Sequence, residues 1–403
     1  MNKHLITIID DGINQNFFEV GELKHNLHIT SELDICERVG YDPFLPSHGT
    51  TCAAIIKKYA PDAILSSIKI LGDESLKGMK EQLVKALEWC SNNKVRLVNL
   101  SLGTIDFKDF PVIEKLVNYA ADRGVIVVAA CNNRNIYTCP ASLKKVIGVK
   151  CDHSGILEEQ KYMYNTDALD GIEITACGSH ELVNYKGESK ITPACNSFAT
   201  PAVTALVYNM IKEDERITID QIKENLKEKA VKYPICEDNF FKREIYRGRY
   251  DSENIEIPIL VLYNFAKNSE SLNNVDIYEI AIQLTELFRK EGYNTISAVS
   301  NQFYANCIKG IVPISEVNIE KYGLAKELKC ICTVFDPDFL IVPIDTEKEE
   351  LKMDIESHYE IDIKINVFDD VLEVTSEKGS KKFDIQKGID IKMLYIYIYV
   401  LLG

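Results

Sequence analysis

Three short segments carry the residue types of a serine nucleophile and of the two groups that activate one. TIIDDGIN contains Asp10 after an apolar run, PSHGTTCAAI contains His48 before a helix-like run, and ACNSFATPAV contains Ser197 before another. A serine hydroxyl is a weak nucleophile, so it needs a base, usually a histidine, to accept its proton. The histidine needs a carboxylate that fixes its tautomer and stabilises its cation. These three residues are therefore candidates for acyl-transfer chemistry.

The surrounding pattern predicts how the three residues are positioned. Apolar runs that read as buried strands alternate with runs of helical periodicity; the strands are expected at 4–10, 63–71, 95–103, 125–133 and 145–151, and the helices at 49–60, 79–93, 110–124, 200–213 and 218–232. This alternation predicts a parallel sheet covered by helices on both faces. Active sites of such sheets gather at the carboxyl ends of the strands. Asp10, His48 and Ser197 all lie at strand ends or helix starts, so they are expected to converge.

The chain has 403 residues, which is more than one core usually carries, and two domains are expected. We predict a first domain at 1–236, a charged linker at 237–254 and a smaller α/β or α+β domain at 255–403. Its first loop, AKNSESLNNVD, contains no glycine, so nucleotide hydrolysis is not predicted there. Cys330 and Cys332 are expected in a strand or turn, and the tail at 393–402, with alternating Ile and Tyr, is expected to be a strand.

Composition excludes several classes of function. The net charge of −15 argues against a nucleic-acid partner, because phosphate binding needs a basic surface. The tail is about half as long as a helix that spans a membrane, so no span is predicted. Twelve cysteines without disulfide-type spacing, and no secretory segment before the first strand, favour a reduced, cytoplasmic protein. The acidic residues are scattered, so no calcium or other metal site is predicted, nor any cofactor.

The order Asp, His, Ser along the chain is that of the subtilisin-type triad. The segments IIDDGI, SHGTTCAAII, VNLSLG, GVIVVAACNN, CPASLKKVIGV and CNSFATPAVTAL resemble six motifs of the subtilases, peptidase family S8, in the family's order over residues 5–235. The resemblance implies a subtilisin-like α/β fold and serine endopeptidase activity. The chain as a whole, rich in Cys, Ile, Lys and Asn and with no signal segment expected, resembles divergent cytosolic subtilases of anaerobic Gram-positive bacteria.

The resemblance also implies a role for each matched residue. Asp10, rather than Asp11, is the triad carboxylate, because it stands directly before the Ser/Thr-Gly position of the family motif. His48 is the general base and then the acid, and Ser197 is the nucleophile. The side-chain amide of Asn133 and the backbone N–H of Ser197 stabilise the oxyanion. The substrate backbone pairs as an added strand with Ser101, Leu102 and Gly103.

Some positions depart from the family pattern. Cys195 and Asn196 replace Gly-Thr, Ala202 replaces a His, and Asn132 replaces the Gly before the oxyanion Asn. None of these removes a catalytic group. The alternative role is a helix cap for Ser197 and a cap or turn residue for Asp10. For His48 the alternative is a surface histidine, and for Asn133 a turn residue. Another set, Cys52, Cys131 and Cys195, is close in sequence to the candidate groups and is expected to pack in the core; the alternative is redox inhibition through these thiols.

We therefore predict an intracellular serine endopeptidase that acts on a peptide or protein substrate. Some of the cytosolic subtilases that the chain resembles mature ribosomally made peptides, so removal of a leader from a precursor peptide is the specific hypothesis. One alternative is a pseudoprotease that binds peptides as a scaffold. Another is a regulatory protease that activates a protein zymogen.

Overall fold

The computed structural model describes residues 5–72, 78–232, 255–266, 276–345, 349–386 and 388–403. The chain divides into two compact units, Met1–Phe240 and Phe241–Gly403. The predicted linker at 237–254 lies outside the described residues. The predicted domain limits therefore stay a prediction, and each unit is described by itself.

The first unit is built on a nine-stranded sheet, ordered β3-β2-β4-β1-β5-β6-β7-β9-β8. The strands from β2 to β9 in this order run parallel, and only β3 and β8, at the two edges, pair antiparallel. The strands are β1 (Leu5–Asp10), β2 (Leu23–Ile29), β3 (Ile35–Glu37), β4 (Ile64–Lys69), β5 (Leu97–Leu100), β6 (Ile126–Ala130), β7 (Ile147–Cys151), β8 (Tyr162–Tyr164) and β9 (Ile174–Ala176). A separate hairpin follows, of β10 (Glu181–Val183) and β11 (Ser189–Ile191).

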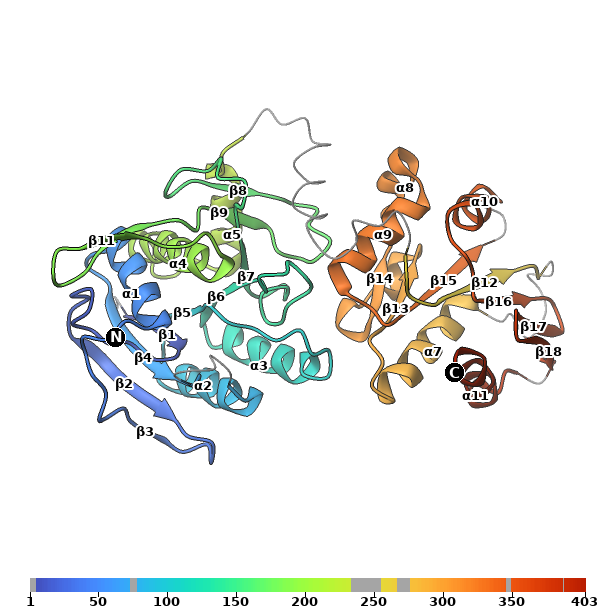
Figure 1. Cartoon of the computed structure of the whole chain (residues 1–403), viewed down its shortest axis with the longest axis horizontal. Helices are drawn as coiled ribbons and strands as arrows, with labels where there is room; N and C mark the ends of the chain where they lie inside the picture. Colours follow the sequence, from blue (N-terminus) through green and yellow to red (C-terminus); the bar gives the residue numbers. More distant parts are fainter. Residues whose placement is uncertain (1–4, 73–77, 233–254, 267–275, 346–348, 387) are drawn as a thin grey trace. The chain divides into compact units, whose positions relative to one another are not determined.

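Helices cover both faces of this sheet, as expected from its buried apolar strands (Figure 1). The helices are α1 (His48–Tyr59), α2 (Lys80–Asn92), α3 (Phe110–Asp122), α4 (Asn196–Glu213) and α5 (Ile219–Lys229). Helices α1, α4 and α5 share one hydrophobic core with the sheet, and α2 and α3 lie on the opposite face. Thr218 is the N-cap of α5, because its side chain accepts from the N–H of Gln221.

Strand β1 fixes the place of the candidate site. All of its residues are buried, and it pairs in parallel with β4 on one side and β5 on the other. A strand in this position has no solvated face, which explains its continuous apolar run. It ends at Asp10, so the carboxylate emerges at the carboxyl edge of the sheet.

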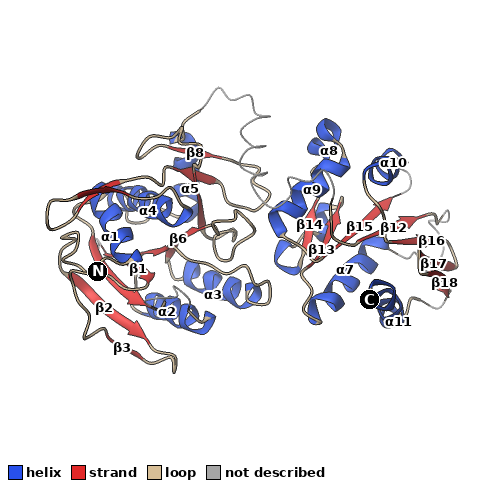
Figure 2. Ribbon diagram, viewed as in Figure 1, coloured by secondary structure: helices blue, strands red, loops and turns tan. Residues whose placement is uncertain are grey.

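The second unit contains a seven-stranded sheet, ordered β14-β13-β15-β12-β16-β17-β18. Its strands are β12 (Ile259–Asn264), β13 (Thr295–Val299), β14 (Ile311–Pro313), β15 (Phe339–Asp345), β16 (Ile363–Val367), β17 (Val371–Ser376) and β18 (Gly379–Asp384), with only β17 and β18 added antiparallel. Helices α7 (Ile277–Lys290) and α11 (Ile391–Leu402) cover one face, and α8 (Glu316–Tyr322), α9 (Leu324–Phe335) and α10 (Glu349–His358) lie on the other (Figure 2). The unit is an α/β domain.

The prediction of a strand for the tail at 393–402 is wrong. The tail is helix α11, with Asp390 as its cap, whose carboxylate accepts from the N–H of Lys392 and of Met393. The buried residues Leu394, Ile398 and Leu401 recur at helical spacing and pack against α7. The alternation of Ile with Tyr fits the two-residue period of a strand. The residues that are buried in the core, however, recur with the period of a helix, near 3.6 residues. The cysteines Cys330 and Cys332, predicted in a strand or turn, likewise lie in helix α9.

Two substitutions distinguish the helix from a strand in the tail. Ile398 is fully buried and Ile396 is 56% exposed, although a strand would place both on the same face. We expect Ile398→Ala to lower the free energy of unfolding of the second unit by about 2–5 kcal/mol. Ile396→Ala is expected to change it by less than about 0.5 kcal/mol. Chemical denaturation monitored by circular dichroism measures both, and equal losses would contradict the helical packing.

Candidate active site

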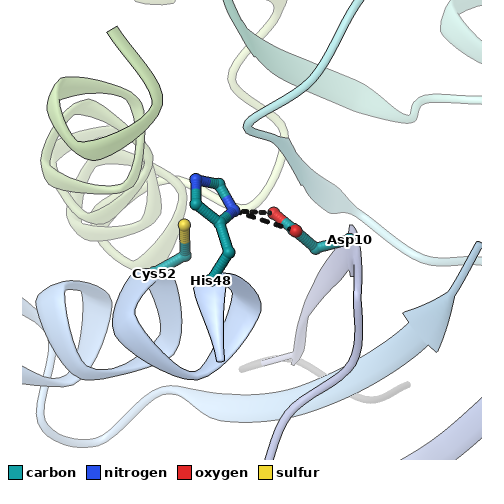
Figure 3. A group of neighbouring side chains, drawn as sticks. All are labelled: Asp10, His48 and Cys52. Atoms are coloured by element: carbon teal, nitrogen blue, oxygen red, sulfur yellow. Dashed lines mark hydrogen bonds and ion pairs between the residues drawn. The ribbon is translucent and has the colours of Figure 1, made fainter. Parts of the chain in front are cut away.

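Asp10 and His48 form the closest pair of the candidate site. The Nδ1 atom of His48 lies 2.9 Å from each carboxylate oxygen of Asp10, and the Asp10 side chain is only 1% exposed. Figure 3 shows the imidazole at the start of α1 with one edge toward Asp10. A carboxylate only accepts hydrogen bonds, so Nδ1 carries the proton and Nε2 is left as the basic nitrogen. This is the tautomer that a general base needs.

Asp11 serves a different purpose from Asp10. Its two carboxylate oxygens accept from the N–H of His48 at 2.9 Å and of Gly49 at 2.7 Å, so it holds the start of α1. A Cβ atom at Gly49 would lie 2.8 Å from the carbonyl oxygen of Gly12, which explains the glycine after the histidine. The choice of Asp10 over Asp11 agrees with this arrangement, although the catalytic role itself stays a prediction.

The environment of His48 raises its pKa above the ordinary value of 6.5. Burial by itself lowers this pKa, but the hydrogen bond and the negative charge of Asp10, with a smaller contribution from Asp11, outweigh burial. Burial and the charge of Asp10 raise the pKa of Asp11. The pair Asp10–His48 is thus arranged to stabilise an imidazolium ion, the species that forms when a base takes a proton.

Ser197 lies in the first turn of α4, and the residue that follows it contacts His48. The ring of the following residue, Phe198, stacks on the His48 ring with 5.2 Å between centroids. The Oγ atom of Ser197 donates to the carbonyl oxygen of Ser101 at 3.3 Å in this conformation, rather than to His48. The structure therefore brings the three predicted triad residues to one place and joins two of them by a hydrogen bond.

Pro201 explains why the backbone at Ser197 is held by residues outside α4. Proline has no N–H, so the carbonyl of Ser197 loses the donor that a helix supplies four residues later. The hydroxyl of Ser101 donates to this carbonyl at 2.8 Å, and the Sγ atom of Cys52 lies 3.7 Å from it. Ser101 is in turn contacted by the side-chain amide of Asn99 at 3.1 Å. The end of β5 thus fixes the start of α4.

The segment Ser101–Leu102–Gly103, predicted to bind the substrate backbone, follows β5 directly. A Cβ atom at Gly103 would meet Cγ2 of Thr138 at 2.7 Å, so the chain passes too close for any larger residue. Beyond it, Thr104 pairs with Cys139 through two backbone hydrogen bonds of 2.8 and 2.9 Å. This anchoring gives the segment a fixed position, while its contact with substrate stays a prediction.

Asn196, a departure from the family pattern, organises the loop that carries Asn133. Its Oδ1 accepts from the N–H of Cys151 at 2.6 Å, and its Nδ2 donates to Asn132 O at 2.8 Å and to Asn135 Oδ1 at 3.0 Å. Its own N–H donates to Asn133 Oδ1 at 3.3 Å. The Oδ1 atom of Asn133 is thus held by the Asn196 backbone. Its Nδ2 atom is the donor of the amide, and the predicted oxyanion role requires such a donor.

The sequence contains a signal that could have predicted this hydrogen-bond network. Four asparagines, Asn132, Asn133, Asn135 and Asn196, occur in two segments that the triad already brings together. An amide both donates and accepts, so such a set can satisfy itself across two loops.

The cysteines near the site are mostly buried. Cys52 and Cys131 are 0% and 4% exposed, and burial raises the pKa of Cys131 to about 12 and that of Cys52 well above its ordinary value. Burial also raises the pKa of Cys195. Protonated thiols are poor nucleophiles, so core packing is the better interpretation. Redox inhibition stays an alternative; an unchanged activity after alkylation of these thiols would exclude it.

One group of described residues has the composition of a metal site: Asp10, His48 and Cys52, whose potential ligand atoms lie within 4.8 Å of one another (Figure 3). Its Asp10 and His48 atoms already pair with each other, and the Cys52 thiol faces Ser101. We assign Asp10 and His48 to the predicted triad and propose no metal for this group.

Comparison with known proteins identifies the family. The profile of the subtilase family, Peptidase_S8, matches residues 2–245. The chain belongs to the subtilase family. The predicted family, the subtilisin-like α/β fold and the assignment to serine endopeptidases are confirmed at this level.

Individual relatives of this subtilase are distant. It is 27% identical over 236 residues to subtilisin BL of Lederbergia lenta, which is 54% of this chain and 85% of that protein. It is 28% identical over 196 residues to the minor extracellular protease Epr of Bacillus subtilis, covering 46% of this chain but only 29% of that protein. A solved lanthipeptide protease overlays on 58% of this chain and 82% of its own, with 17% identity and a TM-score of 0.45.

The raised pKa of His48 predicts the pH dependence of this subtilase. As the predicted general base, His48 must be neutral to accept a proton, so kcat/KM should rise with pH through a pKa above 6.5. In Asp10→Asn the imidazolium loses its anionic partner, so this pKa should fall. We expect kcat to fall by roughly 10⁴-fold as well, because the amide favours the wrong tautomer. Asp34→Asn, a change at an exposed carboxylate, is the control; an acid limb that stays in place in Asp10→Asn would contradict the assignment.

The asparagine network predicts a second effect. Asn196→Ala leaves the Cys151 N–H without its acceptor, which should cost about 1–3 kcal/mol of unfolding free energy. It also removes the side-chain bonds to Asn132 O and Asn135 Oδ1, which hold the loop on both sides of Asn133, so kcat should fall by as much as about 100-fold. Denaturant titration and initial rates measure the two effects. Asn196→Thr, with the family's usual residue, reaches fewer partners and should also lose activity; wild-type activity in that variant would show that the network does not position Asn133.

Proposed function

We propose that the chain hydrolyses peptide bonds with Asp10, His48 and Ser197 as its catalytic triad. The observation that carries the proposal is the buried carboxylate of Asp10, 2.9 Å from the imidazole that lies beside the nucleophile's helix. Such a pair fixes the base and stabilises its cation, which is what activation of a serine hydroxyl requires.

The reaction follows from the groups present. When a peptide binds, Ser197 Oγ attacks the scissile carbonyl carbon and its proton passes to Nε2 of His48. The carbonyl oxygen becomes an oxyanion, stabilised by the Asn133 side-chain amide and the Ser197 backbone N–H, one of the first N–H groups of α4, which have no intrahelical acceptor. The protonated His48 gives its proton to the leaving amine, and an acyl-enzyme remains. Water attacks the acyl-enzyme with His48 again as the base, which releases the new carboxylate and restores Ser197.

For the substrate, we propose a precursor peptide whose leader is removed in the cytoplasm. A second folded unit, Phe241–Gly403, supplies surface outside the peptidase unit for recognising one partner. None of the described cysteines forms a disulfide, in agreement with a reducing compartment. Among the described residues, no helix has the length and apolar character to cross a membrane.

Labelling with a fluorophosphonate probe tests the triad directly. We expect the purified wild-type chain to be labelled, and Ser197→Ala and His48→Ala not to be, because the probe reports an activated serine. No labelling of the folded wild type would contradict the triad. That result would favour the pseudoprotease, for which the Ser197 hydroxyl bonded to Ser101 instead of His48 is the supporting observation.

Cleavage assays test the substrate class. We expect a precursor peptide encoded beside the gene to be cut at one bond, with kcat/KM at least roughly 100-fold above that for casein, about 3 kcal/mol of discrimination. Casein degraded as readily as the peptide would contradict leader removal but leave the triad intact. Selective cleavage of a neighbouring protein zymogen would favour the regulatory protease.

A further inference from the structure

His180 is a buried, titratable residue that the proposed reaction does not use. It lies between β9 and β10 and is 0% exposed. Its backbone is fixed at the base of the β10–β11 hairpin, because its N–H donates to Oγ1 of Thr192 at 2.9 Å and its carbonyl accepts from the Thr192 N–H at 3.0 Å. The hydroxyl of Thr192 donates onward to Gly178 O at 2.9 Å. The direction of the imidazole is therefore set by the hairpin.

The two ring nitrogens of His180 contact two different helices. Nε2 lies 3.1 Å from the carbonyl oxygen of Phe198 in α4, and Nδ1 lies 2.8 Å from the hydroxyl of Tyr59 in α1. A carbonyl only accepts, so Nε2 carries the proton, and Nδ1 then accepts from Tyr59. Burial lowers the pKa of His180, which favours this neutral ring. Burial and the nearby Glu159 raise the pKa of Tyr59, so its hydroxyl keeps the proton that it donates.

These two contacts lead to the nucleophile and to the base. Phe198 directly follows Ser197, and its ring stacks on His48. Tyr59 is the last residue of α1, the helix that begins with His48, and its side chain points back along the helix because Cβ atoms tilt toward the N-terminus. One imidazole is thus bonded to both helices that carry catalytic groups.

We propose that His180 is a positioning residue that keeps α1 and α4, and with them His48 and Ser197, in their relative place. The inference rests on the proposed function, since it concerns the same triad. His180 is not itself catalytic, because its ring nitrogens are bonded to Tyr59 and Phe198 and not to the reacting groups.

The hydrogen bond from His180 to the Phe198 carbonyl indicates that His180 positions α4 and does not merely fill space in the core. The carbonyl of Phe198 already has a helical donor available, the N–H of Ala202 four residues later. The Phe198 carbonyl oxygen therefore accepts from His180 in addition to its helical donor. The bond from His180 orients this carbonyl and is not needed merely to give it a partner. Losing it should affect the orientation of the first turn of α4 more than the stability of the unit.

Saturation kinetics of fluorophosphonate labelling test the proposal, because they separate probe affinity from the first-order rate of labelling. His180→Leu keeps an apolar filling but removes both hydrogen bonds. We expect its labelling rate to fall roughly 10- to 100-fold, the scale of a small misplacement of catalytic groups, with probe affinity unchanged within about twofold. His180→Gln keeps an N–H donor near the place of Nε2, and its rate should stay within about threefold of wild type.

The matched control is Leu226→Ala, a large-to-small change at a fully buried position in α5. It should lower the melting temperature without changing the labelling rate of the folded protein. An unchanged rate in folded His180→Leu would overturn the proposal. Equal losses in His180→Leu and His180→Gln would overturn it too, because then no particular hydrogen bond matters.

Nuclear magnetic resonance of ¹⁵N-labelled histidines tests the positioning role of His180 without relying on enzymatic activity or probe labelling. We expect His180 to show one tautomer, protonated at Nε2, and the ring signals of His48 to shift in His180→Leu but not in His180→Gln. If the folded wild type takes no probe, the proposed function is wrong, and the His48 signals then decide about His180 alone. Identical His48 signals in wild type and His180→Leu would overturn the positioning role.

Discussion

The burial of the Asp10 carboxylate beneath His48 is the constraint on which the rest of the site depends. An ionised carboxylate that is 1% exposed is costly unless hydrogen-bond donors surround it. The His48 ring supplies one donor, and the N–H of Asp11 supplies another at 2.9 Å. The donor from His48 requires α1 to begin directly over the end of β1. The carboxylate of Asp11, which accepts from the first two N–H groups of α1, meets that requirement.

The start of α4 is under a comparable constraint. A nucleophile in the first turn of a helix needs a backbone that does not move, yet Pro201 removes one of the hydrogen bonds that would hold it. The side chain of Ser101 replaces the missing donor, because its hydroxyl bonds the Ser197 carbonyl. Asn196, the first residue of α4, joins the helix to the loop of Asn133. The hydroxyl of Thr204, one helical turn beyond, donates to Asn99 Oδ1 at 2.8 Å and so links α4 back to β5. The site is thus held by polar contacts between elements that are distant in sequence.

How much could be predicted from the sequence follows from this arrangement. The strands around β1 and the helices α1 and α4 could be predicted from the sequence. Their apolar residues repeat with the period of each element, and their ends carry the residue types of a catalytic triad. The tail was mispredicted since alternating Ile and Tyr satisfies a strand pattern locally, whereas packing of Leu394 and Ile398 against α7 is a property of the folded unit. Contacts such as that of His180 with Phe198 have no periodic signature. They depend on where a hairpin places one side chain, which no local pattern encodes.

The departures from the family pattern are best understood together. Asn132 and Asn196 replace a glycine and a threonine at positions far apart in sequence, and each brings an amide that needs hydrogen-bond partners. In the structure the Nδ2 of Asn196 donates to the Asn132 backbone and to Asn135, so one departure supplies a partner for the segment that contains the other. Asn135 itself has a positive φ of 56°, a conformation that asparagine tolerates better than most residues. Buried amides are stable only when their donors and acceptors are all engaged, so reverting one of these residues alone should not restore the family's geometry. The altered residues around Ser197 therefore form a different support for the same predicted catalytic groups, and they do not by themselves indicate that catalysis has been lost.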